Sequence, residues 1–139
     1  MTQSSAVDRL LDLIAAGRGG DAAGLYAPEA VLDATVPGWR FQKHGGAAIA
    51  GVWAGWFDAP GELQELERVA TPDGEVVSYL QTAVDEGAPF AAHHCHVLAL
   101  DPASGLVRRH LVWCGGRWSA DLIEEMAQAQ RAEAAEAVR

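Results

Sequence analysis

Residues 25–57 read LYAPEAVLDATVPGWRFQKHGGAAIAGVWAGWF, and this stretch says more about the fold than any other part of the chain. The run VLDATV at 31–36 predicts a strand, Pro37-Gly38 predicts a turn, and residues 40–44 predict a short second strand. Gly45-Gly46 ends this pair, and a helix is expected over 47–57. The apolar residues of that helix fall on one stripe at helical spacing: Ile49, Val52, Trp53, Trp56 and Phe57.

The segments on either side extend the pattern in both directions. Before the stretch we expect a helix over 4–16, which ends at Gly17, and a short helix over 20–26. After it we expect four strands, over 62–71, 75–85, 90–101 and 106–114. A last helix should begin with Ser119 as its N-cap, and its tail has almost no apolar stripe, which indicates fraying or a partner. The sequence thus predicts a single α+β domain over residues 1–139, with a core over about 5–127 and a helical tail over about 128–139.

Composition excludes several classes of function. Half of the residues are hydrophobic, yet no apolar run approaches the roughly 18–20 residues that a membrane span needs. The formal net charge of −9 argues against nucleic acid or an anionic membrane as a partner, because there is no basic stripe to neutralise phosphates. The N-terminal residues MTQSSAVDRLL lack the pattern of a secretory signal, and the chain has two cysteines. We therefore expect a cytoplasmic protein without a disulfide framework.

The order of elements resembles that of a known superfamily. Gly45-Gly46 before the aromatic helix and Gly115-Gly116-Arg117-Trp118 after the last strand carry the resemblance, which covers about residues 5–127. The chain resembles the cone-shaped α+β barrels of the nuclear transport factor 2-like (NTF2-like) superfamily, especially its SnoaL-like branch. The resemblance implies a curved antiparallel sheet wrapped around N-terminal helices, a built-in pocket, and a homodimer packed through the outer sheet face. A helix–strand sandwich of another topology is the alternative.

The loop at 102–105 predicts how the last two strands face each other. A four-residue loop with Gly105 in the left-handed conformation would pair Asp101 with Leu106. The inner face would then hold the cross-strand pairs His94–Trp113, His96–Leu111 and Leu98–Arg109. The outer face would hold His93, Cys95, Val97, His110, Val112 and Cys114. A slip of one residue would invert these faces.

Ketosteroid isomerases share the fold that the resemblance implies, and Ala16 to Ala34 can be laid on their sequences without a gap. Their general-base aspartate then falls on Ala34 and their oxyanion-hole tyrosine on Leu10. Their second oxyanion-hole acid falls on His96 and a pocket aromatic residue on Trp113. The resemblance thus places His96 and Trp113 inside the cone. It also implies that none of the three catalytic side chains of steroid isomerisation is present at the matching positions. We do not expect that reaction.

Two histidines on one strand, His94 and His96, are the main catalytic candidates. Residues at i and i+2 on a strand project from the same face. Imidazoles titrate near neutral pH, so the pair could transfer protons or donate to a developing oxyanion, and we expect a ligand oxygen to approach His96. The alternative is that both rings belong to the pocket wall and bond to neighbours, among them Tyr79 and Gln81.

A zinc site is a sharper alternative for the two histidines. A His-x-His pair on a strand is a recurrent ligand pair, but a third ligand would have to come from His44 or Asp33. Nothing in the spacing requires this, so we expect neither a metal nor a cofactor.

Two charged residues are further candidates, Arg109 as a catalytic group and Asp33 as a ligand contact. A buried arginine needs a carboxylate partner or an anionic ligand, and Arg109 could pair with Asp33 or Glu67. Asp33 follows Leu32 and precedes Ala34 in a strand, so Asp33 faces outward if Ala34 faces inward, unless a bulge re-aims it.

The remaining candidates for ligand contact are mostly aromatic: Trp113, Trp53, Trp56, Trp39, Tyr79 and Leu111. Core packing is the alternative for the tryptophans. Cys95 and Cys114 are expected to be reduced, small apolar residues on the outer face.

Two classes of function remain open from the sequence. The first is a SnoaL-like small-molecule pocket protein, with acid–base chemistry (isomerase, cyclase or hydrolase) on an apolar cyclic substrate. The second is a non-catalytic binding or dimerisation module. The inward histidines favour the first class, the missing catalytic carboxylates favour the second, and whether the protein is an enzyme stays undecided.

Overall fold

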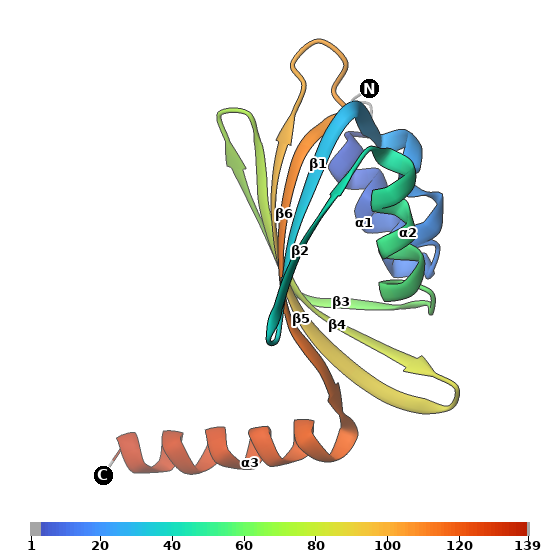
Figure 1. Ribbon diagram of the computed structural model, residues 1–139. Helices are drawn as coiled ribbons and strands as arrows, with labels where there is room; N and C mark the ends of the chain where they lie inside the picture. The colour runs from blue at the N-terminus through green and yellow to red at the C-terminus, as the bar shows by residue number, and fades with distance from the viewer. Residues whose placement is uncertain (1–3, 139) are drawn as a thin grey trace.

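The computed structural model describes residues 4–138 and contains one six-stranded sheet with helices beside it (Figure 1). The helical elements are α1 (Ala6–Ala16), the 3₁₀ segment η1 (Gly19–Leu25), α2 (Gly46–Trp56) and α3 (Ala120–Ala137). The strands are β1 (Tyr26–Val36), β2 (Trp39–His44), β3 (Gly61–Thr71), β4 (Gly74–Asp85), β5 (Ala88–Leu100) and β6 (Val107–Ser119). This order is the one expected, although β1 starts before position 31 and β6 continues past position 114.

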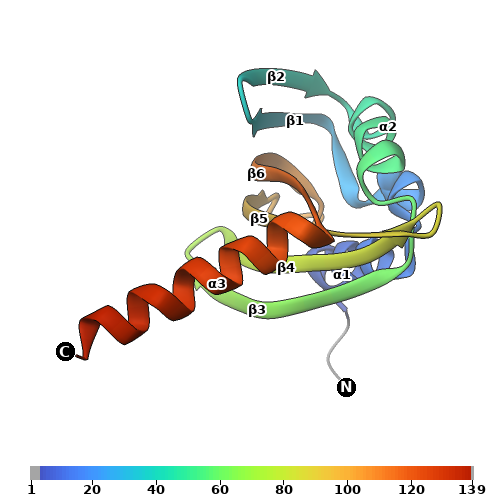
Figure 2. The ribbon, with the colours of Figure 1, turned by 90° about the horizontal axis from the view of Figure 1, so that it is seen from below.

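The strands are arranged in the order β2-β1-β6-β5-β4-β3. All neighbours are antiparallel except β1 and β6, so the curved sheet that the sequence predicted as antiparallel is mixed, with one parallel pair. A parallel pair needs a long connection, which the chain from β2 to β5 supplies. The sheet curves around α1 and α2, while α3 leaves the end of β6 and extends away from the body (Figures 1 and 2). The predicted α+β cone is confirmed.

Helix α1 has specific signals at both ends. The Ser5 hydroxyl accepts from the N–H of Asp8 (3.0 Å), and the Asp8 carboxylate accepts from the N–H of Ser5 (2.9 Å). Gly17 ends the helix in the left-handed conformation, with φ of 71°. The apolar face of α1 is buried against the concave side of the sheet: Ala6, Val7, Leu10, Leu11 and Ile14. None of the helices in residues 4–138 is both long and apolar enough to cross a bilayer.

The register between β5 and β6 differs from the prediction. The loop pairing is as expected, since the N–H of Asp101 donates to the carbonyl of Leu106 (2.8 Å). Beyond the loop Arg108 is an extra residue in β6, so Ala99 pairs with Arg109. This bulge inverts the predicted faces of β6 and leaves those of β5 unchanged.

The faces of β6 are therefore exchanged relative to the prediction. His110 and Val112 are fully buried on the concave side, together with the half-buried Cys114. Arg109, Leu111 and Trp113 lie on the convex side, where Leu111 pairs with Asp33 of β1. On β5, His94 and His96 face the concave side as predicted.

Helix α3 has no buried residue, although it is helical to Ala137. Ser119 caps it as predicted, because its hydroxyl accepts from the N–H of Leu122 (3.2 Å). The tail from residue 128 thus continues the helix as far as Ala137.

Candidate functional site

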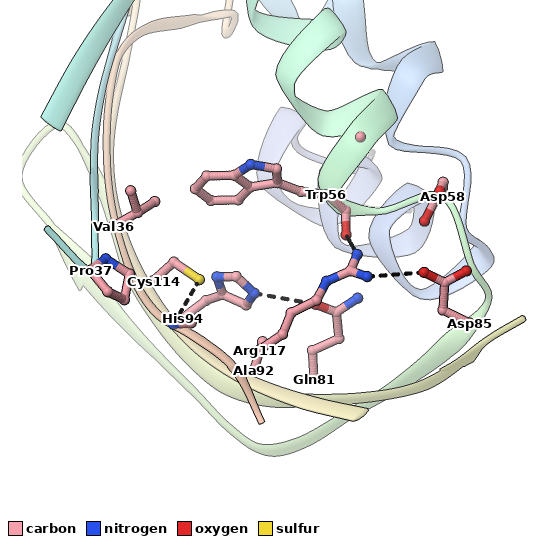
Figure 3. Close-up of a pocket in the computed structure, with 12 residues that line it drawn as sticks. Val36, Pro37, Trp56, Asp58, Gln81, Asp85, Ala92, His94, Cys114 and Arg117 are labelled. Atoms are coloured by element: carbon pink, nitrogen blue, oxygen red, sulfur yellow. Dashed lines mark hydrogen bonds and ion pairs between the residues drawn. The ribbon is translucent and has the colours of Figure 1, made fainter. Parts of the chain in front are cut away.

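A pocket of about 290 Å³ opens where the C-terminal end of α2 faces strands β1, β4, β5 and β6 (Figure 3). This volume is at the lower end of the roughly 300–1,000 Å³ typical of small-molecule sites. Trp56, His94 and Cys114 form much of its wall, and Figure 3 shows the Trp56 indole beside the His94 ring. Charged residues lie at its rim: Asp58, Asp85 and Arg117.

His94 presents an unused hydrogen-bond acceptor in this pocket. Its Nε2 lies 3.2 Å from Oε1 of Gln81, and because an amide oxygen only accepts, Nε2 carries the proton of the neutral ring. Nδ1 then has a free lone pair, and it is the one buried side-chain N or O atom in residues 4–138 without a hydrogen-bond partner. A buried polar atom left unpaired costs roughly 1–3 kcal/mol. A ligand that donates to Nδ1 would recover that free energy.

Burial keeps the His94 ring neutral. His94 is 3% exposed, and desolvation, followed by the nearby His93 and Arg117, lowers the pKa of His94 to about 4. The ring stacks on Trp56 (centroids 5.8 Å apart, 28° between planes) and meets Phe57 edge-on at 5.4 Å. These contacts fix the orientation of the ring, so Nδ1 is held in place before any ligand arrives.

A chain of five buried side chains lies deeper than His94. The Trp53 indole N–H donates to the Tyr26 hydroxyl (2.9 Å), which lies 2.9 Å from Nδ1 of His110. Nε2 of His110 is 2.7 Å from Nδ1 of His96, and Nε2 of His96 is 2.9 Å from the Tyr79 hydroxyl. Every ring nitrogen in this chain has a partner, in contrast to Nδ1 of His94. Tyr79 and Gln81, named as possible neighbours in the alternative reading of the two histidines, are hydrogen-bonded to His96 and His94 respectively.

Burial also sets the ionisation of the side chains in this hydrogen-bonded chain. Desolvation lowers the pKa of His110 to about 3 and lowers the pKa of His96 well below its usual value of 6.5. It raises the pKa of Tyr26 and Tyr79 above 10.0. If both imidazoles were protonated, two N–H groups would face each other across 2.7 Å. All four titratable groups of the chain are therefore neutral at pH 7.

The rim of the pocket is shaped by a second bulge in β6. Cys114 pairs with His94 and Arg117 with Ala92, so Gly115 and Gly116 together lie opposite one residue of β5. Gly116 has φ of 94°, a conformation that favours glycine. The bulge turns Arg117 toward the pocket, and the N–H of Gly116 donates to Sγ of Cys114 (3.3 Å). Burial raises the pKa of the Cys114 thiol, so the group is a neutral thiol at pH 7.

Arg117 contacts three protein groups at the rim of the pocket. Its guanidinium forms an ion pair with Asp85 (3.1 Å) and donates to the backbone carbonyl of Trp56 (3.3 Å), as Figure 3 shows. Its Cζ also lies 4.2 Å from the centre of the Phe90 ring.

Several residues predicted for the site lie elsewhere. Arg109 and Trp113 are exposed on the convex face because of the Arg108 bulge, and Leu111 is half-buried there. Trp39 is 70% exposed at the β1–β2 turn. Asp33 also lies on the convex side, as alternation predicted.

Asp33 has its own partners on that side. It accepts two hydrogen bonds from Arg40 (2.9 and 2.6 Å) and one from Gln42 (3.2 Å). The hydrogen bonds from Arg40 are the main cause that lowers the pKa of Asp33 to about 2.

The structure brings only part of the predicted set together. His94 and Trp56 line the pocket. His96, Tyr79 and Trp53 are buried behind it, so His96 does not face the space in which a ligand would lie. Three residues predicted to face outward, His110, Val112 and Cys114, are instead on the concave side. The Gly115-Gly116 pair was the one sequence signal that could have located Arg117, since paired glycines in a strand often mark a bulge.

The zinc alternative does not fit the geometry. No group of three His, Cys, Asp or Glu residues within 4–138 is placed to hold a metal ion. Asp33 and His44 lie on the convex side, across the sheet from His94 and His96. The site offers one neutral acceptor, one thiol and an aromatic wall, with charged residues at its rim.

Comparison with known proteins identifies the fold. No protein-family model matches the sequence, and no curated protein matches it. A solved structure of a proposed isomerase from Bacillus subtilis matches with a TM-score of 0.63 at 12% identity, over 79% of this chain and 84% of that one. A hypothetical protein with a ketosteroid isomerase-like fold from Catenulispora acidiphila DSM 44928, solved in complex with trimethylamine, matches with a TM-score of 0.62 at 13% identity, over 87% of this chain and 90% of that one. The chain has a ketosteroid isomerase-like fold.

This fold agrees with the α+β cone that the sequence predicted. Within a ketosteroid isomerase-like fold, Leu10 and Ala34 occupy positions that the resemblance assigned to catalytic groups, and both are core residues here. His96 occupies the third such position and is bonded on both ring nitrogens. The likeness therefore concerns the architecture and not the chemical groups of the site.

Proposed function

We propose that the protein binds a small, largely apolar and cyclic organic molecule in this pocket, with His94 accepting a hydrogen bond from the ligand. The observation that carries the proposal is the buried, unpaired Nδ1 of His94. The Trp56 indole supplies an apolar face for a ring, and the pocket volume suits a small ligand. That a protein of this fold has been solved in complex with trimethylamine supports a ligand of this size.

Acid–base chemistry of the SnoaL-like kind would use the same lone pair. Nδ1 could remove a proton from the ligand, while the Gln81 amide holds the ring through Nε2. Gln81 is neutral, so it orients His94 without stabilising the imidazolium as a carboxylate would. His94 is therefore suited to acidic O–H, N–H or activated C–H groups rather than to weakly acidic carbon.

An NMR titration of the protein with benzyl alcohol, followed at the imidazole nitrogens of the histidines, tests the binding proposal. The expected result is a shift of the His94 Nδ1 resonance as a hydrogen bond forms, with quenching of tryptophan fluorescence. His94→Phe keeps an aromatic ring beside Trp56 but should abolish the binding. His93→Phe is the matched control, because His93 is exposed on the other face of β5. Binding that survives His94→Phe unchanged would contradict the proposal.

A non-catalytic dimerisation module is the second candidate, and the convex face of the sheet favours it. One residue from each of four adjacent strands pairs with the next to form an apolar row: Val69, Val76, Val97 and Leu111. Trp113 lies beside this row and is 45% exposed, and Val69 is 59% exposed. Apolar patches of this kind often mark protein–protein interfaces.

Light scattering at micromolar concentration tests the homodimer, whose expected mass is twice the 14.7 kDa of one chain. Val97→Glu should shift the mass toward a single chain, whereas Asp12→Asn on α1 should not. A single-chain mass for the unsubstituted protein would rule the dimer out.

A further inference from the structure

The charged groups around the pocket are not balanced. Asp58 and Asp85 contribute two negative charges, and Arg117 contributes one positive charge, which leaves one negative charge among the lining residues while His94 is neutral. The chain as a whole carries a net charge of −9. Such a field attracts cations and repels anions as they approach.

The one cation among the lining residues of the pocket is already paired with a carboxylate. The guanidinium of Arg117 is occupied by the Asp85 carboxylate, the carbonyl of Trp56 and the face of Phe90. An anion would have to compete with the Asp85 carboxylate for this charge. Asp58, in contrast, has no hydrogen-bond or ion-pair partner within residues 4–138, so its charge remains uncompensated.

Two further groups favour a positive charge inside the pocket. The last turn of α2 lines the pocket with Gly55 and Trp56, and a helix C-terminus carries a partial negative charge. The Trp56 ring face attracts cations through its quadrupole. The unpaired Nδ1 of His94 needs a donor, which an N–H group provides.

From this convergence we infer that the ligand is a protonated amine, an organic ammonium ion with at least one N–H and an apolar body. Its N–H donates to Nδ1 of His94, its apolar part lies against Trp56, and Asp58 balances its charge at the rim. The inference rests on the proposed function, because it names the chemical class of the molecule that occupies the same pocket.

Four benzylic probes with different head groups test the inference by calorimetry at pH 7. N,N-dimethylbenzylamine is a cation with one N–H, benzyltrimethylammonium is a cation without N–H, benzyl alcohol is a neutral donor, and benzoate is an anion. The amine should bind about five- to tenfold more tightly than the alcohol, because a charged donor forms the stronger hydrogen bond. It should also bind about fivefold more tightly than benzyltrimethylammonium, which lacks the donor. Benzoate should bind most weakly of the four.

An exposed carboxylate variant tests the charge without disturbing the core. Asp58→Asn should weaken the binding of the amine about two- to fivefold and leave that of benzyl alcohol unchanged. Asp12→Asn is the matched control, since Asp12 is an exposed carboxylate on α1 outside the pocket. Added salt should reduce the difference between amine and alcohol.

The outcomes separate the two proposals. If benzyl alcohol binds through His94 at least as tightly as the amine, or if Asp58→Asn behaves like Asp12→Asn, the ammonium inference is overturned and the proposed pocket function stands. If benzoate binds most tightly, the inference is likewise overturned. If none of the probes shifts the His94 resonance, the proposed function fails and the inference falls with it.

Discussion

His94 and the pair His96–His110 lie on the same concave face, yet they have opposite hydrogen-bonding states. His96 and His110 use both ring nitrogens within a buried hydrogen-bonded chain that passes through Tyr26 and ends at Trp53 and Tyr79. His94 uses only Nε2, and its Nδ1 is left without a partner beside a pocket. A buried network in which every polar group is hydrogen-bonded stabilises one conformation. An unpaired acceptor beside a cavity can instead accept a hydrogen bond from a ligand.

Position on the sheet explains this difference. The two inward residues of β6 that pair next to His96 and His94 are Val112 and Cys114. His110 lies one step further along β6, within reach of His96 and Tyr26, but no imidazole or hydroxyl occupies the equivalent place beside His94. We therefore predict that substitutions among the five hydrogen-bonded side chains affect the stability of the fold. Substitutions around His94 should instead affect ligand binding.

The largest expected effect is on stability, from His110→Ala. The substitution removes a fully buried ring and leaves Nδ1 of His96 unpaired, so the free energy of unfolding should fall by about 2–5 kcal/mol. Urea unfolding measures it. His93→Ala is the control and should change that free energy by less than about 0.5 kcal/mol, because His93 is exposed. Equal losses of unfolding free energy in the two variants would contradict a structural role for the hydrogen-bonded side chains.

Acid should destabilise the fold in a defined window. In the unfolded chain the histidines titrate near 6.5, while in the folded chain the pKa is about 4 for His94 and about 3 for His110. Between these values the unfolded state binds more protons, so stability is full above about pH 6.5 and is lost as the pH falls. Within this window each of the two histidines lowers the free energy of unfolding by up to about 1.4 kcal/mol for each unit by which the pH falls.

Unfolding measured between pH 6.5 and 4.5 tests this, because Asp33, with a pKa of about 2, titrates below the window. His94→Phe should reduce the slope by the contribution of one histidine. A flat stability profile across the window would show that the rings are not held neutral.

A smaller effect is expected from Gln81→Glu, which places a carboxylate where the amide oxygen now lies 3.2 Å from Nε2 of His94. An opposite charge at this distance should raise the pKa of His94 by about 1–3 units from its value of about 4. An NMR titration of the His94 ring measures the shift. Gln64→Glu, at an exposed position of β3, is the matched control. An unchanged pKa in Gln81→Glu would argue against the hydrogen bond.

The smallest effect is expected from Arg109→Ala, although the sequence marked Arg109 as the pocket cation. Arg109 is exposed on the convex face, so stability should change by less than about 0.5 kcal/mol and the binding of benzyl alcohol should not change. Arg117→Ala should alter the binding, because it removes the contacts of the rim with Asp85 and Trp56. If Arg109→Ala altered the binding of benzyl alcohol and Arg117→Ala did not, the assignment of faces on β6 would be wrong.

Local patterns in the sequence were sufficient for the elements and for part of the site. Helical spacing located α2 and its aromatic stripe, of which Trp53 and Phe57 are fully buried. Alternation correctly placed His94 and His96 on the concave face, and it placed Asp33 on the convex one. These inferences depend on periods of two or about 3.6 residues within a single element, which the sequence states directly.

The two faces of β6 could only be assigned by the tertiary structure. Its residues 107–114, VRRHLVWC, carry apolar and polar side chains on both alternating sets, so the pattern does not favour either face. The Arg108 bulge shifts the register by one residue, and the Gly115–Gly116 bulge shifts it again to bring Arg117 to the pocket. Bulges are set by how β6 packs between β1 and β5, which is a property of three strands together. The sequence by itself therefore determined the cone and its inward histidines on β5, while the packing of β6 decided that His110 completes a buried chain and that His94 keeps a free nitrogen.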